Sequence, residues 1–170
     1  MKDKQIIVLM GGPSEEAEVS RRTGAAIAEA LVSKGYKAQT LELNPRTVLK
    51  DIDSLGGEVV FNAIHGRYGE DGALQGLLEM AEIPYTGSGI MAHAVGMNKK
   101  VSKDVFKGAN IPTARSESYN GNLESAEAII DHIRKEFTIP VVVKSATQGS
   151  SIGVTIVREE SQLEAAVTEA

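Results

Sequence analysis

The sequence predicts an α/β fold in which helices cross over a parallel sheet. Three strand-length segments support this prediction, at residues 5–10, 36–43 and 58–64, and the first and third are nearly all apolar. Apolar residues at helical spacing follow the first and the third of these segments. Strands that alternate with helices in this way are typical of a parallel sheet with crossover helices.

The first strand is expected at Gln5–Met10, a short run of Ile, Val and Leu that ends at a pair of glycines. Residues 19–31 then show helical spacing, and Gly35 is a natural helix stop. Three glutamates crowd the first turn of this helix, where the helix dipole favours negative charge. The third strand, at residues 58–64, is followed by a glycine-rich loop and by a second helix at residues 74–81.

The character of the chain changes near Gly96, and we expect a domain boundary there that separates residues 1–96 from residues 97–170. No internal repeat or low-complexity linker marks the change. The elements expected in the second part are helices at residues 98–106 and 123–137, strands at 141–144 and 153–157, and a last helix opened by a capping box from Ser161 to Glu164.

The composition is that of an ordinary globular protein. The 170 residues include 18 basic and 23 acidic side chains, and the resulting charge of −5 argues against a nucleic-acid binder that works through a general basic field. The absence of cysteine excludes a disulfide framework, a cysteine-based zinc site and a thiol nucleophile. No apolar run approaches the roughly 18 residues of a membrane span, and the N-terminal run is too short for a signal peptide. The expected location is the cytoplasm, with no membrane partner.

The first candidate site is the segment Gly11-Gly12-Pro13-Ser14-Glu15-Glu16, between the first strand and its helix. Ligands of open α/β sheets bind beyond the carboxyl ends of the strands. The glycines allow close approach by a ligand, whereas the glutamates at the helix start would repel an anion and attract an ammonium group. The segment therefore favours a substrate that carries an amine. The alternative is a charge pattern that complements the helix dipole and binds nothing.

The second candidate is His65, at the start of the glycine-rich loop. It also follows a buried strand, so we expect it at the same sheet edge as Glu16. An imidazole placed there can donate to a carboxylate or an oxyanion. The alternative is a structural histidine. His93 and His132 fall within helical patterns and are assigned no role.

The strongest candidate is the segment from Lys144 to Gly153, in which a lysine ends an apolar strand and a hydroxyl-rich, glycine-bounded turn follows. Such a loop can present backbone N–H groups and hydroxyls to phosphate oxygens, with the lysine as a point charge. The pattern is not the P-loop, which needs Gly-Lys-Ser/Thr at the start of a helix. Lys99 is a candidate second phosphate contact. The alternatives are an ordinary hairpin loop and a solvated surface lysine.

One segment, Gly87-Ser88-Gly89-Ile90-Met91-Ala92, fits the dinucleotide-binding pattern Gly-x-Gly-x-x-Gly/Ala. The strand before it would have only three residues. A lysine-rich helix also stands where the acidic residue of a βαβ unit would be. We therefore expect no nicotinamide cofactor.

Taken together, these segments make the sequence resemble the D-alanine–D-alanine ligase family of ATP-grasp enzymes over nearly the whole chain. The segments that carry the resemblance, in the family's order, are Gly11–Ser20, His65–Gly72 with Gln75-Gly76, Pro84–Gly89, Met97-Asn98-Lys99, Pro140–Lys144 and Gly149–Gly153. The implied fold is an N-terminal parallel-sheet α/β domain at residues 1–96, of the Rossmann-like, pre-ATP-grasp type. The first part of an α+β ATP-grasp subdomain would follow at residues 97–170.

The resemblance implies an ATP-dependent ligase that joins two D-alanines for peptidoglycan synthesis through a D-alanyl phosphate. By the same resemblance, Glu16 would hold the ammonium group of the first D-alanine, His65 would help to orient the reacting carboxyl, and Ser150 would hydrogen-bond near Glu16. The residues that would contact the ATP phosphates are Lys99, Lys144, Gly149, Ser150, Ser151, Ile152 and Gly153.

Two departures from the family pattern stand out. The family's Lys-Pro after the phosphate-side strand is Lys144-Ser145 here, and we expect this change to have a small effect. Family members also continue well beyond Ala170, into the part that carries the magnesium carboxylates and the adenine-binding segment. No metal ligand is therefore expected in this chain, and we expect the chain to fold but not to catalyse alone.

Three questions stay open at this point. The chain could be a non-catalytic binding or regulatory fragment that pairs with a complete ligase. It could belong to a ligase of the D-alanine–D-lactate type, because the residues that choose the second substrate lie outside it. Oligomers are common in the family, but nothing in the sequence shows a homodimer.

Overall fold

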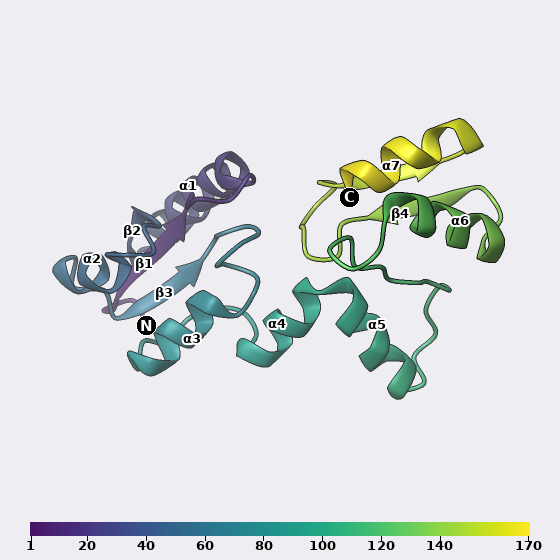
Figure 1. Ribbon diagram of the computed structural model, residues 1–170. Coiled ribbons are helices and arrows are strands. Elements are labelled where there is room, and N and C mark those ends of the chain that lie inside the picture. Colours follow the sequence, from purple (N-terminus) through teal and green to yellow (C-terminus); the bar gives the residue numbers. More distant parts are fainter. The chain divides into compact units, whose positions relative to one another are not determined.

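The computed structural model describes residues 1–170, which form two compact units, Met1–Met97 and Asn98–Ala170. The first unit is a parallel α/β structure, and the second is an α+β structure built on an antiparallel strand pair (Figure 1). The fold class predicted from the sequence is confirmed. None of the helices combines the length and the apolar character that crossing a bilayer requires.

The first unit contains three parallel strands and four helices. Their bounds are β1 Gln5–Met10, α1 Ala17–Ser33, β2 Lys37–Glu42, α2 Val48–Ser54, β3 Val59–Asn62, α3 Ala73–Met80 and α4 Ile90–Met97. The strand order is β2-β1-β3, and a single parallel bridge from Val60 to Tyr85 extends the edge beyond β3. Helix α2 was not predicted from the sequence, because its seven residues are too few for a clear periodic signal.

The sheet of the first unit has a hydrophobic core on each face, because successive side chains of a strand point to opposite sides. Ile7 and Leu9 pack on one face against residues of α2 and α3, such as Ile52 and Leu78. On the other face, Ile6 and Val8 belong to the cluster that α1 covers. Burial on both sides explains why β1 is an unbroken apolar run.

All three strands end at the same edge of the sheet, and the loops after β1 and β3 are joined there by Ser20 of α1. The Ser20 side chain is fully buried. Its hydroxyl accepts the N–H of Gly11 at 2.8 Å and donates to the carbonyl of Ala63 at 2.7 Å. One hydroxyl therefore satisfies a backbone donor from the first loop and a backbone acceptor from the second.

The second unit packs two helices on one face of a strand pair. Its elements are α5 Lys99–Gly108, α6 Ala126–Glu136, β4 Val141–Lys144, β5 Val154–Val157, the 3-10 turn η1 Glu160–Gln162 and α7 Leu163–Glu169. Residues of α6, β5 and α7 form one buried cluster that includes Ile130, Val157 and Leu163. On the opposite face of the pair, Val142 and Ile156 lie directly across from each other and are both about half exposed.

The capping box predicted from Ser161 to Glu164 is wrong by two residues. The chain enters the helix through η1, so that Glu159 is the N-cap residue and Gln162 is its partner. The Gln162 side-chain oxygen accepts the backbone N–H of Glu159 at 3.2 Å and that of Arg158 at 2.8 Å. Ser161 lies inside the 3-10 turn, which a search for the start of an α-helix does not detect.

Substituting Ser20 with alanine should destabilise the first unit by about 1–3 kcal/mol, because it leaves the Gly11 N–H and the Ala63 carbonyl buried without a partner. Ser33→Ala is the matched control, since Ser33 ends the same helix and donates to the carbonyl of Ala30 at an exposed position. Its effect should stay within about 0.5 kcal/mol. Urea unfolding of both variants measures the difference, and equal losses would contradict the bridging role of Ser20.

Candidate functional site

Glu16 lies at the start of α1, on the turn that leaves the carboxyl end of β1. Its backbone carbonyl accepts the N–H of Ser20 at 3.0 Å, which begins the helix. Glu15 and Glu18 are exposed, whereas Glu16 is half-buried. The Glu16 carboxylate does not cap the helix and has no hydrogen bond or ion pair within the chain. Its oxygens are therefore available to accept hydrogen bonds from a ligand.

The structure brings the Glu16 turn and the His65 loop together. The Ser14 hydroxyl donates to the backbone carbonyl of His65 at 2.8 Å. A Glu16 carboxylate oxygen lies only 2.9 Å from the place where a side chain at Gly66 would begin. Glycine at position 66 thus leaves room for this carboxylate, and the positive φ of 71° at Gly66 also favours glycine.

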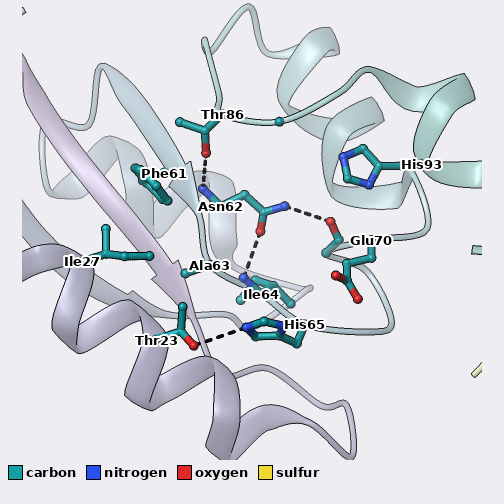
Figure 2. Close-up of a pocket in the computed structure, with 12 residues that line it drawn as sticks. Thr23, Ile27, Phe61, Asn62, Ala63, Ile64, His65, Glu70, Thr86 and His93 are labelled. Carbon is teal, nitrogen blue, oxygen red and sulfur yellow. Dashed lines mark hydrogen bonds between the residues drawn. The ribbon is translucent and has the colours of Figure 1, made fainter. Parts of the chain in front are cut away.

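The imidazole of His65 is held from α1. Its Nε2 atom lies 3.3 Å from the Thr23 hydroxyl, a contact that Figure 2 shows as a dashed line. Hydroxyl and imidazole can each donate or accept in this contact, so it limits the orientation of the ring without fixing its tautomer. Thr23 lies one helical turn beyond Ser20, on the helix that Glu16 begins.

The rest of the glycine-rich loop is fixed by side-chain amides and carboxylates. The carbonyl of Gly69 accepts from the side-chain amides of Asn62 at 2.8 Å and Gln75 at 2.7 Å. Glu70 accepts the N–H of Gly66 at 2.7 Å. These bonds hold the loop in one conformation, so His65 does not depend on its own contacts alone for its position.

A pocket of about 310 Å³ lies beside His65, between α1, the end of β3 and the segment before α4 (Figure 2). In this view, Ile27 and Phe61 line one side and Glu70 and His93 the other. The Nε2 atom of His93 is buried without a hydrogen-bond partner, although no role was assigned to His93 from the sequence. The pocket thus has an apolar wall and a polar wall, as small-molecule sites usually do.

A second cluster of predicted residues, in the Asn98–Ala170 unit, joins Lys99 to the loop after β4. The backbone N–H of Lys99 donates to Ala146 O at 2.9 Å, and its ammonium group donates to Gln148 O at 2.6 Å. Burial lowers the pKa of Lys99, and the nearby charge of Lys144 lowers it further. The two lysines therefore lie within the same local field, and together they favour an anionic ligand.

The loop between β4 and β5 is closed at its base and open at its tip. Ser145 donates its N–H to the carbonyl of Gly153 at 2.8 Å. Gly153 has a φ of 61°, and a side chain there would collide with Ser145. Ser150 has a left-handed φ of 52°, and its side chain and that of Ser151 are exposed. The hydroxyls are thus presented to solvent from a tied base.

The predicted site residues therefore fall into two groups. Glu16 and His65 lie close together in the first unit, and Lys99 and Lys144 lie close together in the second. Ser150 belongs to the second unit, and its predicted hydrogen bond near Glu16 stays a prediction. No group of three or more Asp, Glu or His side chains in the structure could hold a metal ion.

Several residues that support these two groups were not predicted from the sequence. Asn62 could have been noticed as a polar residue inside an apolar strand. Thr23 and Ser20 gave no signal, because they resemble other small residues of an amphipathic helix. Glu42 could have been found from its position as the last residue of β2, at the same sheet edge as Glu16.

Two family models match the chain in order. "D-ala D-ala ligase N-terminus" matches residues 37–88, and "D-ala D-ala ligase C-terminus" matches residues 105–170. A D-alanine--D-alanine ligase of Moorella thermoacetica is 46% identical over 169 residues, which are 96% of this chain and 53% of that protein. The chain thus spans about half the length of the curated relatives that it matches.

Solved structures give the same result. A D-alanine--D-alanine ligase from Bacillus anthracis superposes with a TM-score of 0.76 at 32% identity, over 97% of this chain and 53% of that one. The complex of the Bacillus anthracis ligase with ATP gives a TM-score of 0.72 at 29% identity, over 97% of this chain and 54% of that one. Both matches run through the two units of the chain.

Replacing Lys144 with methionine should raise the pKa of Lys99 toward its ordinary value. The repulsion between the two ammonium groups is lost, while burial still lowers the pKa, so the rise should be partial. Lys103→Met is the control, because Lys103 lies on the same helix and its ammonium group donates to Thr113 and Ala114. An NMR titration of the lysine side chains measures both variants. An unchanged Lys99 pKa in Lys144→Met would show that the charge of Lys144 does not act on Lys99.

Proposed function

Because this chain belongs to the D-alanine–D-alanine ligase family, we propose that it forms part of an ATP-dependent ligase that joins two D-alanines. In this proposal the first unit binds the first D-alanine, and the second unit binds the phosphates of ATP. The observation that carries it is the half-buried Glu16 carboxylate, which has no partner and lies beside the His65 loop at the carboxyl edge of the sheet.

The chemistry at the first unit follows from charge. D-alanine carries an ammonium group, a carboxylate and one methyl group. The ammonium group would donate to Glu16, since a charge-assisted hydrogen bond to an unpaired carboxylate is among the stronger polar contacts. The D-alanine carboxylate would then face His65, whose imidazole can donate a hydrogen bond and orient it. This arrangement accounts for an acidic helix start that would repel a phosphate.

The reaction needs two displacements. An oxygen of the first D-alanine carboxylate attacks the γ-phosphorus of ATP, the bond to the β-phosphate oxygen breaks, and ADP leaves. The amine of the second D-alanine then attacks the acyl carbon, phosphate leaves with the bonding electrons, and the nitrogen loses a proton. Positioning and charge neutralisation supply most of the catalysis in phosphoryl transfer, and the residues described here provide those two functions.

The second unit offers what a nucleotide needs. Lys99 and Lys144 supply positive charge for the phosphates, and the exposed hydroxyls and N–H groups of the loop at residues 149–153 supply donors. Val142 and Lys144 are two residues apart on β4, so their side chains lie on the same face of the strand pair. Ile156, which pairs with Val142, lies on that face too. This exposed apolar surface beside a cationic one suits an apolar base joined to anionic phosphates.

Magnesium, a homodimer and a cytoplasmic location complete the proposal. Magnesium would accompany ATP and shield its charge, and by the family resemblance its protein ligands would lie outside residues 1–170. A homodimer would double the mass measured by analytical ultracentrifugation. The enzyme would act in the cytoplasm, where both of its substrates, ATP and free D-alanine, would be present.

Glu16→Gln should raise the D-alanine concentration needed for half-maximal ADP release by about 10-fold to 100-fold, because a hydrogen bond between two charged groups is lost. Glu15→Gln is the control, since Glu15 is adjacent but exposed. Steady-state ADP release, with D-alanine and ATP varied separately, measures both variants. The assay uses the 170-residue chain and the same chain completed with the unmatched part of the Moorella thermoacetica relative.

The dependence on ATP concentration should not change in Glu16→Gln. If it weakens equally, Glu16 does not act at the amino-acid site. If the completed chain releases no ADP in response to D-alanine, the ligase proposal is wrong and a non-catalytic binding role is favoured.

A further inference from the structure

A carboxylate outside the predicted site joins three elements at the sheet edge where Glu16 lies. Glu42 is the last residue of β2. Its side chain accepts the backbone N–H of Gly12 at 3.2 Å. It also accepts from Arg21 of α1, at 2.8 Å from Nη2 and at 3.2 Å from Nε. One side chain of β2 thus contacts both the turn after β1 and the helix after that turn.

Groups from other elements hold the turn, because the Gly11 N–H donates to Ser20 and the Gly12 N–H donates to Glu42. Gly11 and Gly12 both have left-handed backbones, with φ of 71° and 86°. Glycine reaches such conformations easily but has no preference for them, so a pair of glycines is flexible until other groups fix it. The Glu42 carboxylate fills the space beside Gly11, where a side chain would begin only 2.0 Å from its oxygen. The turn is therefore folded around this carboxylate.

Glu16 depends on this turn for its position. It follows Gly12 by four residues, and its own side chain makes no cap hydrogen bond that would fix it. Arg21 belongs to the helix that Glu16 begins, so the bond from Arg21 to Glu42 also fixes the direction of that helix. Arg21 and the Gly12 N–H lower the pKa of Glu42, which keeps this carboxylate charged.

We propose that Glu42 is a positioning residue for the amino-acid site: together with Arg21 it holds the Gly11-Gly12 turn, and thereby sets where Glu16 presents its carboxylate. This inference rests on the proposed ligase function. Glu42 does not touch the amino acid in this proposal. It acts only through the backbone of the turn and through α1.

Because the ion pair of Arg21 and Glu42 is exposed, an effect of Glu42 on position can be distinguished from an effect on the stability of the fold. The side chains of Arg21 and Glu42 are 45% and 48% exposed, and ion pairs at such positions contribute little to the free energy of unfolding. A matched pair exists at the opposite end of β1. Glu58 accepts from Lys4 at 3.0 Å and from the backbone N–H of Gln5 at 3.0 Å, with both side chains 47% exposed. Glu58 has the same kind of partners and lies far along the strand from Glu16.

The test compares Glu42→Ala and Glu42→Gln with Glu58→Ala in the completed chain. Glu42→Ala should raise the D-alanine concentration for half-maximal ADP release by about tenfold, because small misplacements of a binding group cost rate and affinity. The dependence on ATP should not change. Glu42→Gln should restore part of the loss, since its amide oxygen can still accept from Gly12. Glu58→Ala should match the unsubstituted protein.

A second readout uses the 170-residue chain without turnover. Hydrogen exchange of the Gly12 amide should be faster in Glu42→Ala and unchanged in Glu58→Ala. The proposal is overturned if Glu42→Ala leaves D-alanine dependence unchanged, or if it weakens ATP and D-alanine dependence alike. Absence of D-alanine-dependent ADP release in the unsubstituted protein is a different result, which overturns the ligase function itself.

Discussion

The parallel pairing of β1 with both of its neighbours is the constraint on which the first unit depends. Because β2, β1 and β3 run in the same direction, their carboxyl ends meet at one edge, and the chain must leave each strand there. Backbone N–H and C=O groups just beyond the ends of the strands have no partner within the sheet and need hydrogen bonds from side chains. Ser20 supplies them between the loops after β1 and β3, and Glu42 supplies one between β2 and the turn after β1. Glu16 can stay unpaired because the backbone around it is fixed by others.

The elements that the sequence predicts well are those whose own residues determine them. β1 has the predicted bounds, Gln5–Met10, since a strand buried on both faces is a continuous apolar run. The short helix α2 was missed because only Val48 and Ile52 are buried in it, too few positions to show a period. The misplaced capping box has a similar cause: a 3-10 turn between strand and helix shifts the cap to Glu159, and the motif at Ser161 gives no sign of it.

The candidate site divides in the same way. Glu16 and His65 could be placed at one edge, because two parallel strands precede them and chemistry suggests what each side chain can do. The residues that orient them could not be predicted from the sequence, because Thr23 and Glu42 contact partners that are 42 and 30 positions away in the chain. Contacts between residues so far apart in the chain can be predicted only when the order of the strands in the sheet is known. The carboxyl-edge rule still narrows the search, since it picks out the last residue of every strand, and Glu42 is one of these.

The two groups of site residues also differ in the sign of their charge, so they favour ligands of opposite charge. Glu16 is a half-buried carboxylate with no hydrogen-bond or ion-pair partner in the chain, so an ammonium group is the ligand that complements it best. Lys99 is a half-buried cation whose pKa is lowered by burial and by the charge of Lys144, so a polyanion is the ligand that relieves it. In the proposed function, the ammonium group of a D-alanine would pair with Glu16, and a triphosphate would pair with the lysines. Had the charges been mixed within one group, acid and lysine would have neutralised each other, and neither ligand would be favoured.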